Sequence, residues 1–250
     1  MTHYLIYCKG DILLTEEGNV PFGIEPPIRL QPWNHVTTIS SRGEEYEIAR
    51  IDSPYTGGNG YRMFGLRSTY NILNSEDYAM AGKGAELAYW DYNTRHCGVC
   101  GSPMKWNSPI SKRCVQCNKE IWPSPSTAII VRITRDDKIL LVRANSFRGD
   151  FYGLVAGFVE TGENLEQCVR REVMEETGLE ISNIQYFDSQ AWPYPYGLMI
   201  GFTAEYAKGE IRLQKLELCQ GAWFTRDNLP NIPDKASIAR RLIDDWIWKG

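Results

Sequence analysis

The fold of this chain is decided by the stretch Gly157-Phe-Val-Glu-Thr-Gly-Glu163, followed after seven residues by Arg171-Glu-Val-Met-Glu-Glu-Thr-Gly-Leu179. The pattern predicts a helix over 163–177, with a glycine directly after it, where helices commonly end. On such a helix Glu172 and Glu176 lie one turn apart, on a face that they share with apolar residues. Both carboxylates are therefore predicted to face inward.

Inward-facing carboxylates repel each other and are costly to remove from water. Hard divalent cations relieve both effects, and oxygen-rich sites select Mg²⁺ or Mn²⁺. Glu175 lies at the edge of the same face, and Arg171 is placed to orient one of these acids or the loop carboxylate Glu163. An acidic, solvated helix face paired with arginines is the alternative, but the fixed spacing of the whole pattern favours a metal site.

The segment 157–179 resembles the Nudix box, Gly-x5-Glu-x7-Arg-Glu-apolar-x-Glu-Glu-x-Gly-apolar, at every defined position. Nudix hydrolases cleave nucleoside diphosphates that are linked to another moiety, and the box supplies their metal-binding loop, helix and loop. The resemblance implies that Mg²⁺ or Mn²⁺ is held by Ala156 (through its carbonyl), Glu172, Glu176 and Glu217. It implies a catalytic set of Glu163, Arg171, Glu172, Glu175 and Glu176. Either of the last two could accept the proton of the attacking water.

A second motif, Ser189-Gln-Ala-Trp-Pro-Tyr-Pro195, resembles the SQPWPFPxS signature of the NADH pyrophosphatase branch of this superfamily. Ala191 replaces the first proline, Tyr194 replaces phenylalanine, and Tyr196-Gly197 replaces Gln-Ser; these departures concern the preferred dinucleotide rather than the chemistry. A rigid aromatic turn is the alternative. The resemblance implies substrate contacts at Trp122, Gln190, Ala191, Trp192, Pro193, Tyr194, Pro195, Tyr196, Gly197, Ala239 and, more weakly, Arg67.

Four of the seven cysteines form two matched knuckles, Cys97-Gly-Val-Cys100 and Cys114-Val-Gln-Cys117, which thirteen residues separate. This spacing is typical of a zinc ribbon, in which four thiolates surround one metal ion. A pair of disulfides or a redox motif is the alternative. Because four thiolates leave no open coordination position, we expect the zinc to be structural. The other three cysteines, Cys8, Cys168 and Cys219, are predicted to be core thiols.

Three parts follow from these motifs: a β-rich N-terminal domain (1–93) that ends in a helix capped by Ser75, a zinc ribbon (94–122) and a Nudix domain (123–250). The fold class is α/β, with the last part an α/β/α sandwich around a mixed sheet. Its strands are predicted at 128–133, 138–143, 152–158, 184–191, 198–206 and 221–224. A closing helix is predicted at 236–248.

The charge and the apolar stretches of the sequence argue against two classes of partner, nucleic acid bound non-specifically and the membrane. With 27 Lys and Arg against 31 Asp and Glu, the net charge is −4, so the chain lacks the global basic field of non-specific nucleic-acid binders. Apolar stretches are too short to span a bilayer, and the N-terminus lacks the pattern of a secretory signal. We expect a soluble, cytoplasmic protein without a membrane partner, and the resemblance implies a homodimer.

The activity expected is metal-dependent hydrolysis of NADH or NAD⁺ to nicotinamide mononucleotide and AMP. NAD-capped RNA is a candidate substrate, because the branch is similar to NAD-cap decapping enzymes, and RNA contact is expected in a local basic groove of Lys105, Lys112, Arg113 and Lys119. Two alternatives stay open. One is a Nudix hydrolase of another substrate such as ADP-ribose, and the other is a non-catalytic nucleotide sensor, which the retained carboxylates disfavour.

Overall fold

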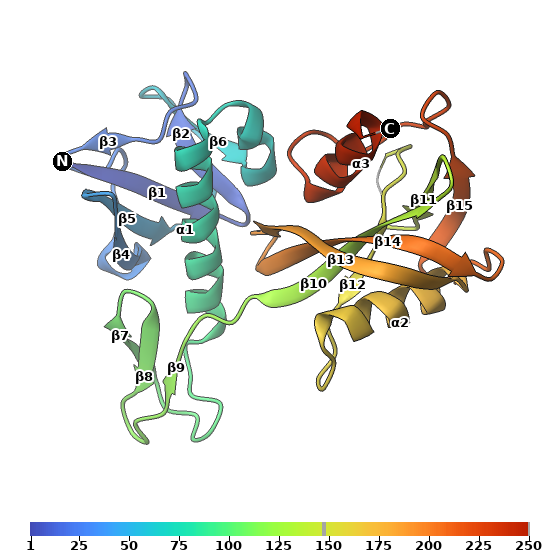
Figure 1. The fold of residues 1–250 in the computed structure, drawn as a ribbon. Coiled ribbons are helices and arrows are strands. Elements are labelled where there is room, and N and C mark those ends of the chain that lie inside the picture. Colours follow the sequence, from blue (N-terminus) through green and yellow to red (C-terminus); the bar gives the residue numbers. More distant parts are fainter. Residues whose placement is uncertain (147–148, 250) are drawn as a thin grey trace. The chain divides into compact units, whose positions relative to one another are not determined.

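The computed structural model describes residues 1–146 and 149–249 (Figure 1). The chain divides into two compact units, residues 1–125 with 192–196 and residues 126–191 with 197–250. In the described part of the chain, no helix has the length and apolar character needed to cross a membrane.

The first unit is built on a sheet with the strand order β4-β5-β1-β2-β6, and β3 pairs with β1 (Figure 1). Strands β1 and β5 run parallel, whereas every other neighbouring pair is antiparallel. The strands are β1 (Thr2–Cys8), β2 (Asp11–Thr15), β3 (Phe22–Gly23), β4 (His35–Ser41), β5 (Glu44–Arg50) and β6 (Tyr61–Gly65). Two 3₁₀ helices, η1 (Pro32–Asn34) and η2 (Leu66–Asn71), lie in its connections. The predicted β-rich character of this region is confirmed.

Helix α1 (Ser75–Asn93) packs on this sheet. Its N-cap is Asn74, whose side chain accepts hydrogen bonds from the backbone N–H groups of Glu76 and Asp77, so the predicted cap at Ser75 is wrong by one residue. A Cβ at Gly84 would lie 2.5 Å from the hydroxyl oxygen of Tyr7. The glycine thus allows the helix to approach β1, and the Tyr7 hydroxyl donates to the carbonyl of Ala81 at 2.6 Å.

The cysteine region forms a three-stranded antiparallel sheet of β7 (Met104–Ser108), β8 (Ser111–Cys114) and β9 (Glu120–Ile121). Lys112 is buried, and its ammonium pairs with Asp91 at 2.7 Å between the rings of Trp90 and Trp106. Its Nζ also donates to the Asp91 carbonyl at 2.9 Å, so this lysine ties β8 to the C-terminal end of α1.

The predicted basic groove on the ribbon is therefore wrong for Lys112. Arg113 is also engaged, because its guanidinium pairs with Glu120 at 2.9 Å. A buried lysine cannot meet a phosphate in solvent, and a paired arginine meets one less readily.

The second unit is a mixed sheet with the strand order β13-β14-β10-β11-β15, and β12 pairs with β10. Strands β10 and β14 are parallel and the other pairs are antiparallel, which confirms the mixed sheet. The strands are β10 (Ser126–Arg135), β11 (Lys138–Ala144), β12 (Val155–Phe158), β13 (Glu180–Ala191), β14 (Gly197–Lys208) and β15 (Leu218–Phe224).

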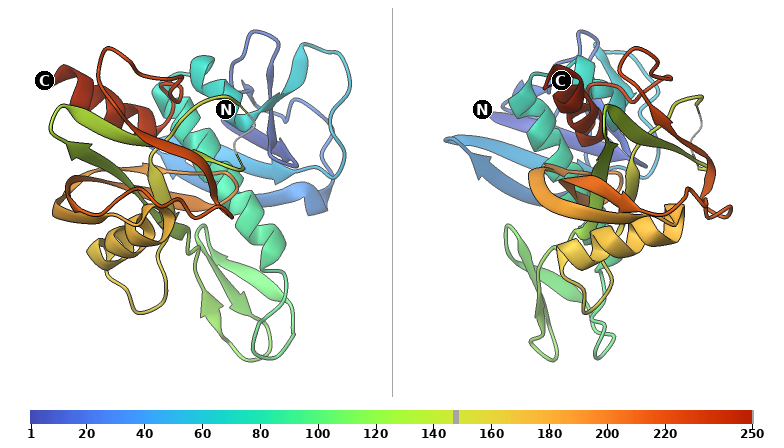
Figure 2. Two further views of the ribbon diagram at one scale, coloured as in Figure 1. Left: turned by 90° about the vertical axis from the view of Figure 1, so that its right-hand side faces the viewer. Right: turned by 45° about the vertical axis from the view of Figure 1, so that its right-hand side comes forward.

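Helices α2 (Leu165–Thr177) and α3 (Ile238–Trp248) cover opposite faces of this sheet (Figure 2). Alternate residues of β10 serve the two cores: Ile129 and Val131 pack with α2, and Ile130 packs with α3. The predicted α/β/α sandwich is confirmed. Of the three single cysteines, Cys8 and Cys168 are buried as predicted, but Cys219 is exposed, which corrects the third assignment.

Candidate active site and metal centre

Helix α2 begins and ends where its sequence dictates. Asn164 and Gln167 form a reciprocal capping box at its start. Gly178 ends it with φ of +70°, in the left-handed region that favours glycine. Of its acids, Glu172 and Glu176 are 8% and 4% exposed. The prediction that both face inward is confirmed.

Strand β12 runs so close to Glu172 that only glycine fits at position 157. A Cβ there would lie 2.0 Å from Cδ and 2.0 Å from Oε1 of Glu172. Because glycine has no Cβ, the carboxylate of Glu172 can occupy this space beside β12.

Arg171 is bound by acids on several sides. Its Nε and Nη2 donate to the two carboxylate oxygens of Glu163, at 2.6 and 3.0 Å. Its Nη1 donates to Glu172 at 2.8 Å and to Glu175 at 3.0 Å, while Nη2 also reaches the carbonyl of Phe158 at 2.9 Å. Arg171 therefore contacts both the loop carboxylate Glu163 and the helix acids, which is the arrangement that an orienting role requires.

Glu217 lies on the loop between β14 and β15, and with Ala156 and Glu176 it lines a pocket of about 510 Å³. Backbone and side chains hold this loop. The N–H of Gln214 donates to the Glu176 carbonyl at 3.0 Å, and Asn145 donates its side-chain amide to the carbonyls of residues 215 and 216, both at 3.0 Å. The structure therefore brings three of the predicted carboxylates, Glu172, Glu176 and Glu217, and the Ala156 residue to one place.

Burial and neighbouring charges shift the pKa values of the acids on and beside α2. It raises the pKa of Glu176 to about 8, and the neighbouring Glu172 and Glu217 raise it further by repulsion. Burial also raises the pKa of Glu172, against the effect of Arg171. Hydrogen bonds from Arg171 lower the pKa of Glu163 to about 2. Carboxylates that repel one another, two of them buried, form the donor set that hard divalent cations fit.

The predicted substrate residues of the second unit lie in its sheet or on its helix α3. Gln190 uses its amide on the start of α3, donating to the Ala236 carbonyl at 2.8 Å and accepting from the Ile238 N–H at 2.6 Å. Ala239 lies on α3 and is buried in the core that this helix forms with the sheet. Gly197 is paired with Ser126 in the sheet. Ala191 ends β13.

The aromatic segment 192–196 groups with the first unit. The Arg67 guanidinium lies 5.1 Å from the ring centre of Trp192, so these two predicted residues are adjacent. The hydroxyls of Tyr194 and Tyr78 are hydrogen-bonded to each other. A phenylalanine at position 194 could not make this bond, which gives the departure from the signature a physical role.

The other members of the segment pack along α1. A Cβ at Gly82 would lie 3.2 Å from Pro193, and the rings of Tyr196 and Tyr89 are 5.9 Å apart. Pro195 lines a pocket with Tyr89. Trp122 is exposed after β9.

The four knuckle cysteines could hold one metal ion, with all four sulfurs within 4.8 Å of one another. The Cys97–Cys117 and Cys100–Cys114 sulfur distances are 3.6 and 3.4 Å. A tetrahedron with Zn–S bonds of about 2.3 Å has edges of about 3.8 Å, so the cluster fits zinc. Backbone N–H groups of Val99 and Gln116 point at the sulfurs of Cys97 and Cys114, each at 3.4 Å, which favours thiolates.

Sequence reasoning missed two residues of the carboxylate site. Asn145 holds the loop that carries Glu217, a contact across 70 residues that no local pattern reveals. Phe158 has an exposed ring directly after Gly157. The carbonyl of Phe158 accepts from Arg171 at 2.9 Å, a backbone contact that the residue type does not signal.

Comparison with known proteins agrees with this geometry. The NUDIX domain family matches residues 123–246. The NAD-capped RNA hydrolase NudC of Pseudomonas aeruginosa is 44% identical over 204 residues, which are 81% of this chain and 73% of that protein. The protein of the same name from Pectobacterium carotovorum subsp. carotovorum is 44% identical over 171 residues, 68% of this chain and 66% of its own length.

Among solved structures, a NUDIX hydrolase from Nitrosomonas europaea matches with a TM-score of 0.51 and 18% identity. The match covers 62% of this chain and 92% of that one. At this level of identity the similarity concerns the fold alone.

Proposed function

The chain belongs to the Nudix hydrolase family, and from this premise we propose that it hydrolyses the diphosphate linkage of NADH, of NAD⁺ and of the NAD cap on RNA 5′ ends. The names of the relatives from Pseudomonas and Pectobacterium support the NAD-capped substrate. The observation that carries the proposal is the pair of buried carboxylates Glu172 and Glu176 with the exposed loop acid Glu217 as a charged neighbour. Burial and the repulsion of these neighbours raise the pKa of Glu176 to about 8.

In this proposal Glu172, Glu176 and Glu217 hold Mg²⁺ or Mn²⁺, with the carbonyl oxygen of Ala156 as a further ligand. The cations, when bound, neutralise the diphosphate and lower the pKa of the attacking water. The water oxygen forms a bond to one phosphorus, and the bond from that phosphorus to the bridging oxygen breaks. The products from a dinucleotide are nicotinamide mononucleotide and AMP.

Burial and exposure support one of the two candidates for the proton acceptor. Glu176 is buried against Glu172 and Glu217, as suits a cation ligand. The side chain of Glu175 is 50% exposed and Arg171 orients it at 3.0 Å. We therefore assign proton transfer from water to Glu175 and positioning of the acids to Arg171 and Glu163.

Substrate contacts are proposed for the segment 190–197, Trp122, Ala239 and Arg67. Within the first unit, the exposed ring of Trp122 and the Arg67–Trp192 pair offer stacking surfaces for a base. The zinc of the cysteine cluster is proposed to be structural. We also propose that the protein forms a homodimer and acts in the cytoplasm.

The test is turnover of NADH, NAD⁺, ADP-ribose and NAD-capped RNA side by side, with Mg²⁺ or Mn²⁺ and with the products identified by mass. Nicotinamide mononucleotide and AMP from the dinucleotides, and 5′-monophosphate RNA from the capped RNA, are expected. Turnover of ADP-ribose in preference to all NAD-containing substrates would overturn the substrate assignment.

A further inference from the structure

We propose that a pocket beside α1 binds nucleotides of single-stranded RNA, as the body of the capped transcript. This inference rests on the proposed function and adds to it a second contact site for the same substrate. The pocket, called here the α1 pocket, has a volume of about 440 Å³ and includes Tyr7, Lys9, Arg50, Leu66, Tyr89 and Tyr92 in its lining. All of it belongs to the first unit.

Two aromatic rings give the α1 pocket a stacking surface. Tyr89 and Tyr92 lie three residues apart on α1, one helical turn, and are 43% and 49% exposed. Tyr89 exposes part of its ring, whereas the ring of Tyr92 carries the guanidinium groups of Arg50 and Arg95. Unpaired bases stack on aromatic rings and on guanidinium planes, whatever their sequence. Helix α1 is held against β1 by the close approach at Gly84, so the rings stand on a rigid support.

Two cations lie over the ring of Tyr92, and a third lines the pocket. The Arg50 guanidinium lies 4.1 Å from the ring centre of Tyr92, and the Arg95 guanidinium lies 4.4 Å from it. Lys9 is exposed at the turn between β1 and β2. Among the described lining residues there is no carboxylate. Asp52 pairs with Arg50 at 3.3 Å and offsets part of its charge, whereas Lys9 and Arg95 have no such partner among the described residues of the pocket lining. An apolar floor with aromatic rings and a cationic rim is complementary to bases and phosphates together.

The floor of the pocket connects it to the segment expected to contact the dinucleotide. Pro193 and Pro195 both line the α1 pocket. In the proposed function this segment contacts the dinucleotide, so within the first unit the α1 pocket adjoins a proposed contact of the cap. This favours RNA over a free mononucleotide as the occupant.

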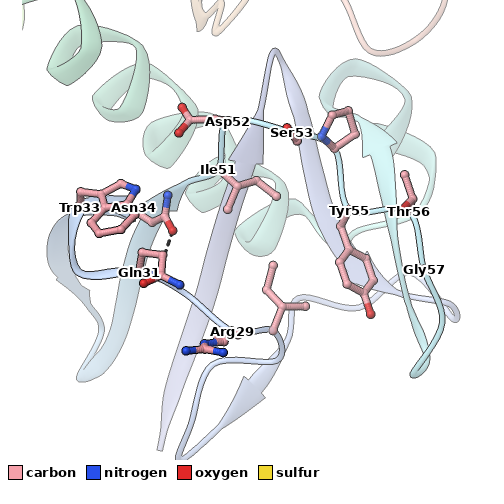
Figure 3. A pocket seen from close by; sticks show the side chains of 12 residues that line it. Arg29, Gln31, Trp33, Asn34, Ile51, Asp52, Ser53, Tyr55, Thr56 and Gly57 are labelled. Carbon is pink, nitrogen blue, oxygen red and sulfur yellow. Dashed lines mark hydrogen bonds between the residues drawn. The ribbon is translucent and has the colours of Figure 1, made fainter.

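Other surfaces of the first unit suit RNA less well. The ribbon cations Lys112 and Arg113 are already engaged by Asp91 and Glu120. A second pocket, shown in Figure 3, places Trp33, Asn34 and Gln31 on one side and Tyr55 on the other. Trp33 is 74% exposed there, but the lining includes the carboxylate of Asp52, which repels phosphate. This pocket supplies matched controls.

The test uses the zinc-loaded full chain and a 3′-labelled, 5′-monophosphorylated single-stranded RNA of about twelve nucleotides, which contains no diphosphate to cleave. Tyr92→Leu removes the platform under the two guanidinium groups. Lys9→Asn removes one charge, and asparagine tolerates the φ of +49° found at this position. The controls are Trp33→Leu and Arg29→Gln in the pocket of Figure 3.

Tyr92→Leu is expected to raise the Kd for RNA at least fivefold, because the guanidinium planes of Arg50 and Arg95 lose their support and a stacked base contributes about 1–3 kcal/mol. Lys9→Asn is expected to raise the Kd and to reduce the slope of log K against log salt by about one. Both variants are expected to keep wild-type kcat/KM for NADH, and the controls to keep wild-type RNA affinity.

Unchanged RNA affinity in both α1-pocket variants overturns the proposal, and so does a loss confined to the Trp33 and Arg29 variants. AMP that displaces the RNA at a Kd equal to that of RNA would make this a mononucleotide site instead. A change in oligomeric state with RNA affinity retained would assign the pocket to a second copy of the chain. RNA binding is measured without hydrolysis, so a wild-type protein that cleaves no NAD-containing substrate would refute the proposed function separately.

Discussion

The guanidinium of Arg171 binds both carboxylate oxygens of Glu163, through Nε at 2.6 Å and Nη2 at 3.0 Å. The same guanidinium reaches Glu172 and Glu175 through Nη1. One planar group therefore fixes the loop that precedes α2 relative to two acids on the helix. Since only a guanidinium offers donors in this fork, the geometry depends on arginine itself.

Arg171→Lys should retain the positive charge but lose the two-point grip on Glu163. We expect kcat to fall by about tenfold or more, because a lysine holds the acids at one point and a small misplacement of catalytic groups is costly. The measurement is kcat and KM for NADH across a Mn²⁺ titration. Arg170→Lys, on the same helix but bound to the carbonyl of Ile181, is the control and should keep wild-type kcat. Wild-type kcat in Arg171→Lys would contradict the positioning role.

Gly157→Ala tests the space occupied by Glu172. The added Cβ would lie 2.0 Å from the carboxylate carbon, so the carboxylate must move away from its position. We expect the metal concentration for half-maximal activity to rise at least tenfold, while far-UV circular dichroism stays unchanged. Gly57→Ala, where a Cβ meets nothing within 4 Å, is the matched control. Equal metal dependence in Gly157→Ala and wild type would show that the close approach has no role in metal binding.

The pH dependence of the metal-free protein follows from Glu176. Its pKa is raised to about 8 in the folded state from an ordinary value of 4.5, so between these values the unfolded chain binds fewer protons than the folded one. Folding stability without metal should therefore fall as the pH rises from about 5 to 8. Glu176→Gln should reduce this slope. Denaturant titrations in a chelator at several pH values measure it, and an equal slope in wild type and variant would refute the assignment to Glu176.

The zinc centre is tested by Cys114→Ser. Loss of one of four thiolates should release zinc and lower the Tm, because removal of a structural metal is among the few single changes that cost several kcal/mol. Zinc content by a chromogenic chelator and the Tm by calorimetry are the measurements. Cys219→Ser, at an exposed cysteine outside the cluster, should leave both unchanged. A folded Cys114→Ser protein that has lost the chemical step but kept its stability would point to a catalytic zinc.

Much of the site could be predicted because its information is local. The spacing in 157–179 already places Glu172 and Glu176 on one helix face, and burial in the structure agrees. The two cysteine knuckles specify a cluster for the same reason, since four ligands at fixed separations have few other uses.

What the sequence could not show depends on contacts between distant residues. Lys112 was read as a surface cation because nothing near it in the chain reveals the Asp91 carboxylate, 21 residues away, or the two tryptophan rings around it. Asn145 and the loop of Glu217 meet only when the sheet brings β11 beside β15. Cys219 was placed in the core because its neighbours are apolar, but strand alternation turns it outward while Leu218 is buried.

The most direct test of the central claim is the Mn²⁺ dependence of NADH hydrolysis, with the products identified, for wild type, Glu172→Gln and Glu176→Gln. Glutamine keeps the volume of each side chain and removes its charge. We predict nicotinamide mononucleotide and AMP from the wild type only with divalent cation present. In both variants we predict kcat/KM at least a hundredfold lower, with half-maximal activity at higher Mn²⁺. If both variants cleave NADH at wild-type rates, these carboxylates are not the catalytic metal site, and the account is wrong.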